Sequence, residues 1–166
     1  ILGRDPGLLR SGWGVVDISG GNAVRYVDCG VIRPDPKLPL DSRLVAIFDG
    51  VQKLLSLLSP TCVAIEEVFV NKNPQTSEKL MMARAAAMIS ASKSGRQVYS
   101  YRPNEIKNNV TGSGHASKER VCVMAQKILN ASIDRSDGTK TADSMDALAT
   151  ALCCAFSLST RIPSIA

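Results

Sequence analysis

Residues 1–32, ILGRDPGLLRSGWGVVDISGGNAVRYVDCGVI, predict three consecutive strands. Short apolar runs are separated there by Pro-Gly and Ser-Gly-Gly-Asn, both of which are typical turn sequences. A proline-rich bend follows and ends the series, so the chain is expected to begin with an antiparallel meander. The three expected strands are residues 1–5, 12–18 and 24–32.

Working outward from this stretch, apolar residues recur at helical spacing or in short unbroken runs. Leu44, Ile47 and Val51 belong to a periodic stretch for which Asp41 or Ser42 is the expected N-cap. Residues 62–65 form a continuous apolar run, as in a strand buried on both faces. The expected helices are residues 41–58, 74–93, a short helix from 103, 117–129 and 141–156, and the further strands are 62–65 and 98–101.

The order β-β-β-α-β-α-β-α-α-α predicts an α/β domain with a mixed five-stranded sheet flanked by helices, and this order matches the ribonuclease H-like fold. The domain is expected to span residues 1–157, with 158–166 as a C-terminal tail. The helix at 74–93 is rich in alanine and methionine. Such residues suit either a core or a subunit interface, and the sequence favours the core.

Composition narrows the class of protein. No apolar stretch approaches the roughly 20 residues of a membrane helix, and a charge at the fourth residue argues against a secretory signal, so a cytoplasmic protein is expected. The five cysteines have no metal-ligand spacing and are expected to be reduced and mostly buried. The net charge of +5 modestly favours polyanionic partners.

Four carboxylates lie where a merely solvated charge is not expected. Asp5 and Glu66 each end an apolar strand, and the carboxyl ends of strands form the ligand crevice of open α/β sheets. Asp143 and Asp146 are three residues apart at the start of a helix, which puts them on one face. Taken singly, Asp5 also suits a turn and Asp143 a helix N-terminus. Together, hard oxygen donors without a histidine or cysteine cluster indicate Mg²⁺ or Mn²⁺ and the two-ion hydrolysis of phosphodiesters.

Four segments occur in the order and at the spacings of one family. ILGRDPG with Gly12-Trp13-Gly14-Val15, AIEEVFVNKN, GSGHASKERV and TADSMDALA cover nearly the whole chain. In these segments the chain resembles the RuvC crossover junction endodeoxyribonucleases, which resolve Holliday junctions.

The resemblance implies a function and a set of site residues. The family cuts two opposed strands of four-way junction DNA symmetrically, as a homodimer, leaving 5′-phosphate and 3′-hydroxyl ends in recombination and repair. It uses two Mg²⁺ ions per site, which Mn²⁺ can replace, and acts with a branch-migration complex of the RuvA and RuvB type. By this resemblance the metal ligands are Asp5, Glu66, Asp143 and Asp146, the catalytic lysine is Lys118, and the DNA contacts are Phe69, Lys107 and Lys118. Lys72, in the polar run after Phe69, is a further expected DNA contact because it could bind a phosphate.

Arg4 departs from the family, which usually has an aliphatic residue beside the first aspartate. Because neighbouring strand residues face opposite sides, Arg4 should point into apolar packing unless its stem reaches outward to water. His115 is left out of the catalytic set.

Two other functions remain open: a junction-binding module without cleavage, which Arg4 keeps possible although the four acids argue against it, and a ribonuclease H-like RNA-processing enzyme. An ATP-binding domain of the actin and sugar-kinase type is not expected, because it needs a second phosphate loop and a second lobe, and neither is found in this sequence.

Overall fold

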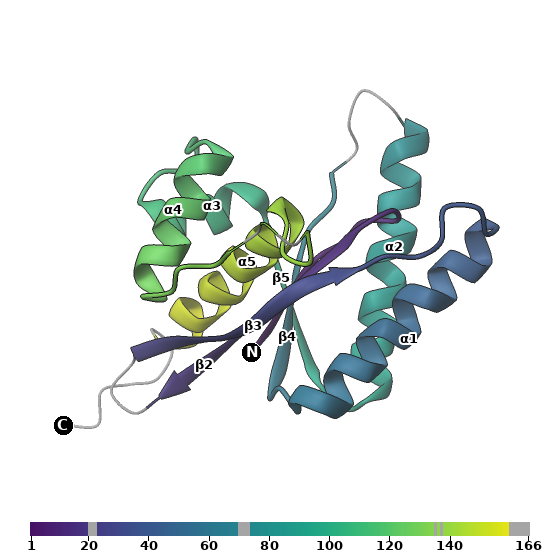
Figure 1. Cartoon of the computed structure of the whole chain (residues 1–166), viewed down its shortest axis with the longest axis horizontal. Helices are drawn as coiled ribbons and strands as arrows, with labels where there is room; N and C mark the ends of the chain where they lie inside the picture. Colours follow the sequence, from purple (N-terminus) through teal and green to yellow (C-terminus); the bar gives the residue numbers. More distant parts are fainter. Residues whose placement is uncertain (20–22, 70–73, 135, 137, 160–166) are drawn as a thin grey trace.

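The first strand pairs antiparallel with one neighbour and parallel with the other. The computed structural model describes residues 1–19, 23–69, 74–134, 136 and 138–159. The five-stranded sheet has the order β3-β2-β1-β4-β5 (Figure 1). The first three strands pair antiparallel, as the turn sequences predicted, whereas β4 pairs parallel with β1, and β5 pairs parallel with β4. The strands are β1 (Leu2–Asp5), β2 (Ser11–Ser19), β3 (Ala23–Ile32), β4 (Cys62–Glu66) and β5 (Gln97–Tyr101).

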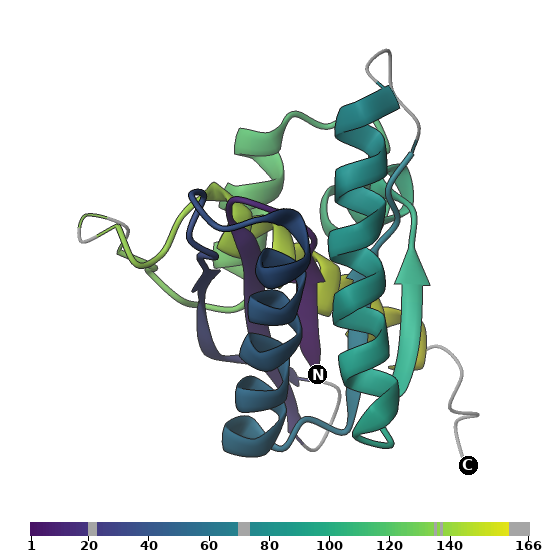
Figure 2. The ribbon, with the colours of Figure 1, turned by 90° about the vertical axis from the view of Figure 1, so that its right-hand side faces the viewer.

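Helices cover both faces of this sheet. The first two helices pack on one face, where Leu2, Val15 and Ile65 of the strands meet the apolar sides of both helices (Figure 2). The last helix packs on the other face, and the two short helices lie against it. The helices are α1 (Leu40–Leu58), α2 (Pro74–Lys93), α3 (Pro103–Thr111), α4 (Lys118–Ile128) and α5 (Ala142–Ser159).

Glycines in β1 and β2 set how closely α5 approaches the sheet. A Cβ at Gly12 would lie 2.0 Å from the carbonyl oxygen of Asp143, and a Cβ at Gly3 would lie 2.0 Å from that of Ala147. Neither contact is possible with a side chain present, because carbon and oxygen pack at well over 3 Å. The glycines therefore bring the first turns of α5 directly over the end of β1.

The predicted element order, strand pairing and fold class are confirmed, and two details at helix ends were wrong. Helix α1 begins at Leu40 with Pro39 as N-cap and no capping side chain, so neither Asp41 nor Ser42 caps it. Helix α5 extends to Ser159, and the hydroxyls of Ser157 and Ser159 hydrogen-bond to carbonyls four residues earlier within the helix. Residues 158 and 159 thus belong to the domain, and 160–166 of the expected tail lie outside the described residues.

Helix α2 serves two surfaces. Ala83, Ala87 and Ala91 are fully buried against α1 and the sheet, as the preference for the core predicted. On another side of the same helix, Met81 and Ile89 are exposed.

Cys29, Cys62, Cys153 and Cys154 are buried and Cys122 is partly buried, all as free thiols. Within the described ranges, no helix combines the length and apolar character needed to span a membrane.

Candidate active site

Four carboxylates from distant parts of the chain meet at the carboxyl end of the sheet. Asp5 ends β1 and Glu66 ends β4, and these strands are parallel neighbours, so both side chains lie at the same edge. Asp143 and Asp146 come from the first turns of α5, which the glycine contacts hold over that edge. Asp5, Glu66 and Asp146 line one cavity of about 110 Å³. The predicted convergence of strand ends and helix start is therefore present in the fold.

The carboxylates repel one another. The pKa of Asp5 is raised well above its usual value by burial, and then by the charges of Glu66, Asp146 and Asp143. Burial, followed by the charge of Asp146, raises the pKa of Glu66 to about 7. Such a cluster is stable in its charged form only when cations sit close to it.

Two basic side chains supply part of this compensation. The Nζ atom of Lys118 lies 2.8 Å from Oδ2 of Asp146, and the Nε atom of Arg10 lies 3.3 Å from Oδ2 of Asp143. The hydrogen bond to Asp146 is the main cause that raises the pKa of Lys118. The side chain of Ser117 caps α4, so Lys118 is the first residue of that helix and reaches across to α5.

Arg10 was absent from the residues expected from sequence. Only its place in the loop after Asp5-Pro6-Gly7 hinted at a role, because that loop leaves the strand that carries the first carboxylate. Its position against Asp143 depends on the approach of α5 to the sheet.

The other expected residues divide into three cases. Lys107 of α3 is partly buried, lines the same cavity as Asp5, and its charge lowers the pKa of Glu66. Phe69 follows β4 and is 50% exposed, so the interpretation as a core residue capping the sheet is wrong. Lys72 lies outside the described residues.

The four carboxylates are of the right chemical type to bind a divalent cation, but they are not arranged around a common point as metal ligands are. Carboxylate oxygens are the ligands that Mg²⁺ and Mn²⁺ prefer, and the mutual repulsion at Asp5 is relieved by positive charge. Among the described residues, however, no group of three or more Asp, Glu, His or Cys side chains is in position to hold a metal ion. Lys118 and Arg10 are drawn to two of the four carboxylates instead, so a metal ion would have to compete with them.

Arg4 lies on the opposite face of the sheet from Asp5, as the alternation of strand residues predicted. Its side chain is 0% exposed, so the alternative of a stem reaching outward to water is wrong. Its Nη2 atom donates a hydrogen bond of 2.7 Å to the hydroxyl of Ser11. The buried Nε and Nη1 atoms have no hydrogen-bond partner within the described part of the chain. Burial lowers the pKa of Arg4 to about 10.

The fold is that of the ribonuclease H-like class of α/β proteins. This class is recognised by the order of the strands, by the helix that lies across the sheet and by the carboxylates at the end of the sheet. A family model described as "Crossover junction endodeoxyribonuclease RuvC" matches residues 1–154, and the chain belongs to this family.

Relatives agree with this membership. The crossover junction endodeoxyribonuclease RuvC of Rhodopseudomonas palustris (strain TIE-1) is 46% identical over 152 residues, which are 92% of this chain and 84% of that protein. The Thermus thermophilus RuvC structure has a TM-score of 0.84 at 32% identity and covers 96% of this chain and 95% of its own. The T. thermophilus RuvC in complex with Holliday junction substrate has a TM-score of 0.85 at 32% identity and covers 96% of this chain and 94% of its own.

Proposed function

We propose that this chain is a divalent-metal-dependent endonuclease that resolves four-way DNA junctions. The observation that carries the proposal is the meeting of Asp5, Glu66, Asp143 and Asp146 beside Lys118. Family membership and the structural likeness to a relative in complex with a Holliday junction substrate support the choice of substrate.

The four carboxylates would hold two Mg²⁺ ions, with Mn²⁺ as a substitute, since hard oxygen donors suit both. When bound, such ions activate a water molecule and stabilise the leaving oxygen in phosphodiester hydrolysis. The ends produced would be a 5′-phosphate and a 3′-hydroxyl.

Two lysines would act on the phosphate itself. Lys118 has a side chain that is 75% exposed and ends beside Asp146, so it can turn toward a phosphate at the carboxylates. Lys107 borders the same cavity from α3. Positive groups placed in advance around a pentavalent phosphorus lower the energy of the transition state, because they need no reorganisation as charge develops.

Phe69 would contact bases near the junction centre. Its half-exposed ring follows the strand that ends at Glu66, so it lies at the same end of the sheet as the carboxylates. An exposed ring can stack on an unpaired base of any sequence. Lys72 of the following segment is proposed as a further DNA contact.

Symmetric cutting of two opposed strands requires two copies of the chain, and helix α2 supplies a surface for pairing. Met81 and Ile89 are exposed two turns apart on this helix, with Ala85 between them. Apolar side chains aligned at spacings of four form a stripe suited to a helix of a second copy. A branch-migration complex of the RuvA and RuvB type is the proposed functional partner.

Parallel assays on a four-way DNA junction and on an RNA duplex, with Mg²⁺ and with chelator, test the proposal. Paired nicks on the junction only with metal are expected. Cleavage of RNA alone would favour a ribonuclease H-like RNA-processing enzyme, and cleavage that survives chelation would remove the metal-dependent assignment.

Asp146→Asn tests the metal site within this function. We expect cutting to be abolished and junction binding to be retained, because the change removes a metal ligand and not a phosphate contact. Asp49→Asn, at an exposed position on α1, is the matched control and should cut normally. A normal cutting rate for Asp146→Asn would refute the assignment of this carboxylate.

A further inference from the structure

A second cavity lies beside the active site, on the α1 and α2 side. It has a volume of about 380 Å³ and is formed by the loop between β1 and β2, the start of α1 and the first turns of α2. Asp143 lines this cavity, so it adjoins the carboxylate cluster. Arg10, Arg43 and Lys79 are its cationic lining residues, and we call it the cation pocket.

Positive charge in the cation pocket is only partly neutralised by the protein. Among the described residues that line it, Asp143 is the one carboxylate, and Arg10 already pairs with that group. Within the described ranges neither Arg43 nor Lys79 forms a salt bridge. Two further cations thus face the same hollow without carboxylate partners, an arrangement that an anion would stabilise.

Arg43 is held in place by the backbone rather than by an acid. Its Nη2 atom donates a hydrogen bond of 2.8 Å to the carbonyl oxygen of Leu8. Its Nε atom is buried and has no hydrogen-bond partner in the described part of the chain. The planar fork of a guanidinium fixed in this way matches the geometry of a phosphate.

The rest of the lining suits a nucleotide unit better than a bare anion. Leu8, Leu9 and Leu80 contribute apolar surface beside the cations. The volume lies within the range of small-molecule sites, about 300–1,000 Å³, and so admits a sugar together with its phosphate.

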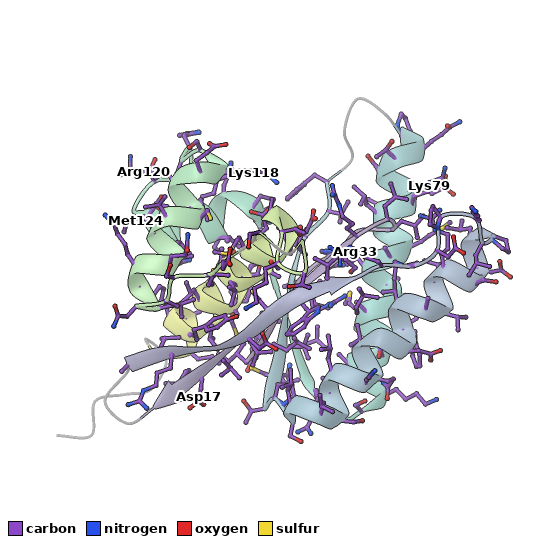
Figure 3. The ribbon with its side chains drawn as sticks, viewed as in Figure 1. Asp17, Arg33, Lys79, Lys118, Arg120 and Met124 are labelled. Carbon is purple, nitrogen blue, oxygen red and sulfur yellow. The ribbon has the colours of Figure 1, made fainter. Side chains whose placement is uncertain are left out.

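We propose that the cation pocket binds a backbone phosphodiester of the DNA strand that runs through the active site, at a linkage away from the one that is cut. This inference rests on the proposed function. Lys118 on α4 and Lys79 on α2 then hold one strand from the two sides of the sheet (Figure 3). Phosphate contacts of this kind fix register and orientation without reading sequence.

Salt dependence gives the first test. Junction binding is measured on the Asp146→Asn background, so that the DNA stays intact, for added Lys79→Gln, Arg43→Gln and Lys53→Gln. Lys53 is an exposed lysine of α1, ten residues beyond Arg43, and serves as the control. Each lost phosphate contact reduces the slope of log affinity against log salt by about 0.9. We expect that reduction for Lys79→Gln and Arg43→Gln and no change for Lys53→Gln.

Single methylphosphonate linkages, which carry no charge, locate the contact. At one linkage near the cut, the neutral group should weaken junction binding by Asp146→Asn. The same group should reduce the affinity markedly less when Lys79→Gln is added. Lys79 is exposed, so its substitution leaves the fold intact even if Arg43→Gln loosens the loop at Leu8. The absence of any linkage with this coupling, while the unmodified protein still cuts junctions, would overturn the pocket and leave the nuclease function standing. Failure of the wild-type chain to bind or cut junctions would remove both.

A test with inorganic phosphate distinguishes a phosphate of the DNA backbone from a free phosphate compound as the anion that the cation pocket binds. If no linkage couples to Lys79, a rise in melting temperature with inorganic phosphate alone that depends on Lys79 would assign the pocket to a free phosphate compound and refute the DNA assignment. Coupling at one linkage assigns the pocket to DNA, whether or not inorganic phosphate also binds there.

Discussion

Replacing Arg4 with methionine should stabilise this protein, although Arg4 lies beside an active-site carboxylate. Its guanidinium is fully buried in the cluster formed by β1, α1 and α2, with one hydrogen bond and two unpartnered nitrogen atoms. Methionine keeps a stem of similar length and fills irregular apolar space without a charge.

The size of the effect follows from the pKa of Arg4, which burial lowers to about 10. A shift of this size corresponds to about 3 kcal/mol of destabilisation of the charged form in the folded state. Loss of the hydrogen bond to Ser11 offsets part of that gain, since a bond from a charged donor contributes about 1.5–3 kcal/mol. We therefore expect a net increase of about 1 kcal/mol in the free energy of unfolding, or roughly 2–4 °C in melting temperature for a chain of this size.

Urea unfolding of the wild type and of Arg4→Met at neutral pH, without metal, measures this change. Because the folded pKa lies below the unfolded one, the penalty on the wild type is fully present below pH about 10 and declines as the pH rises above that value toward the pKa of an unfolded arginine. The gap between the two proteins should narrow over that range. Arg120→Met, at an exposed position, should change stability by less than about 0.5 kcal/mol. A loss of more than about 1 kcal/mol in Arg4→Met would show that the guanidinium makes net favourable contacts and would refute the reasoning.

Three further changes test other parts of the structure. Glu66→Gln should abolish cutting and raise the melting temperature of the metal-free protein at pH about 8. Since the pKa of Glu66 is raised to about 7, this stability gain should vanish below pH about 4.5, where the wild-type carboxyl is protonated in both the folded and the unfolded state. An equal gain at both pH values would contradict the electrostatic explanation. Gly12→Ala should lower the free energy of unfolding by about 1–3 kcal/mol and slow cutting, because its Cβ would meet the carbonyl oxygen of Asp143 at 2.0 Å. Unchanged stability in chemical denaturation would refute the close approach of α5. Met81→Glu with Ile89→Glu should give a monomer in sedimentation if α2 pairs two copies, whereas an unchanged sedimentation coefficient would place the dimer contact elsewhere.

Element order and the positions of the acids could be read from local patterns. Alternation, helical spacing and turn residues depend on near neighbours in the chain, so they predicted the strands, the helices and a carboxylate at the end of β1 and of β4. Recognition of the family motifs added the expected roles of Lys107 and Lys118.

Other features depend on contacts between distant segments. Arg10 meets Asp143 only because glycines in the first two strands let α5 lie against them, and nothing in the loop sequence encodes that approach. The complete burial of Arg4 is likewise a result of two helices closing over β1.

Sequence alone therefore determined which segments are strands and helices, and which residues carry the acids, because backbone and side-chain periodicity are local properties. Tertiary structure decided which charges face one another, which remain buried without partners and where cations gather beside Asp143, because packing brings together residues more than a hundred positions apart.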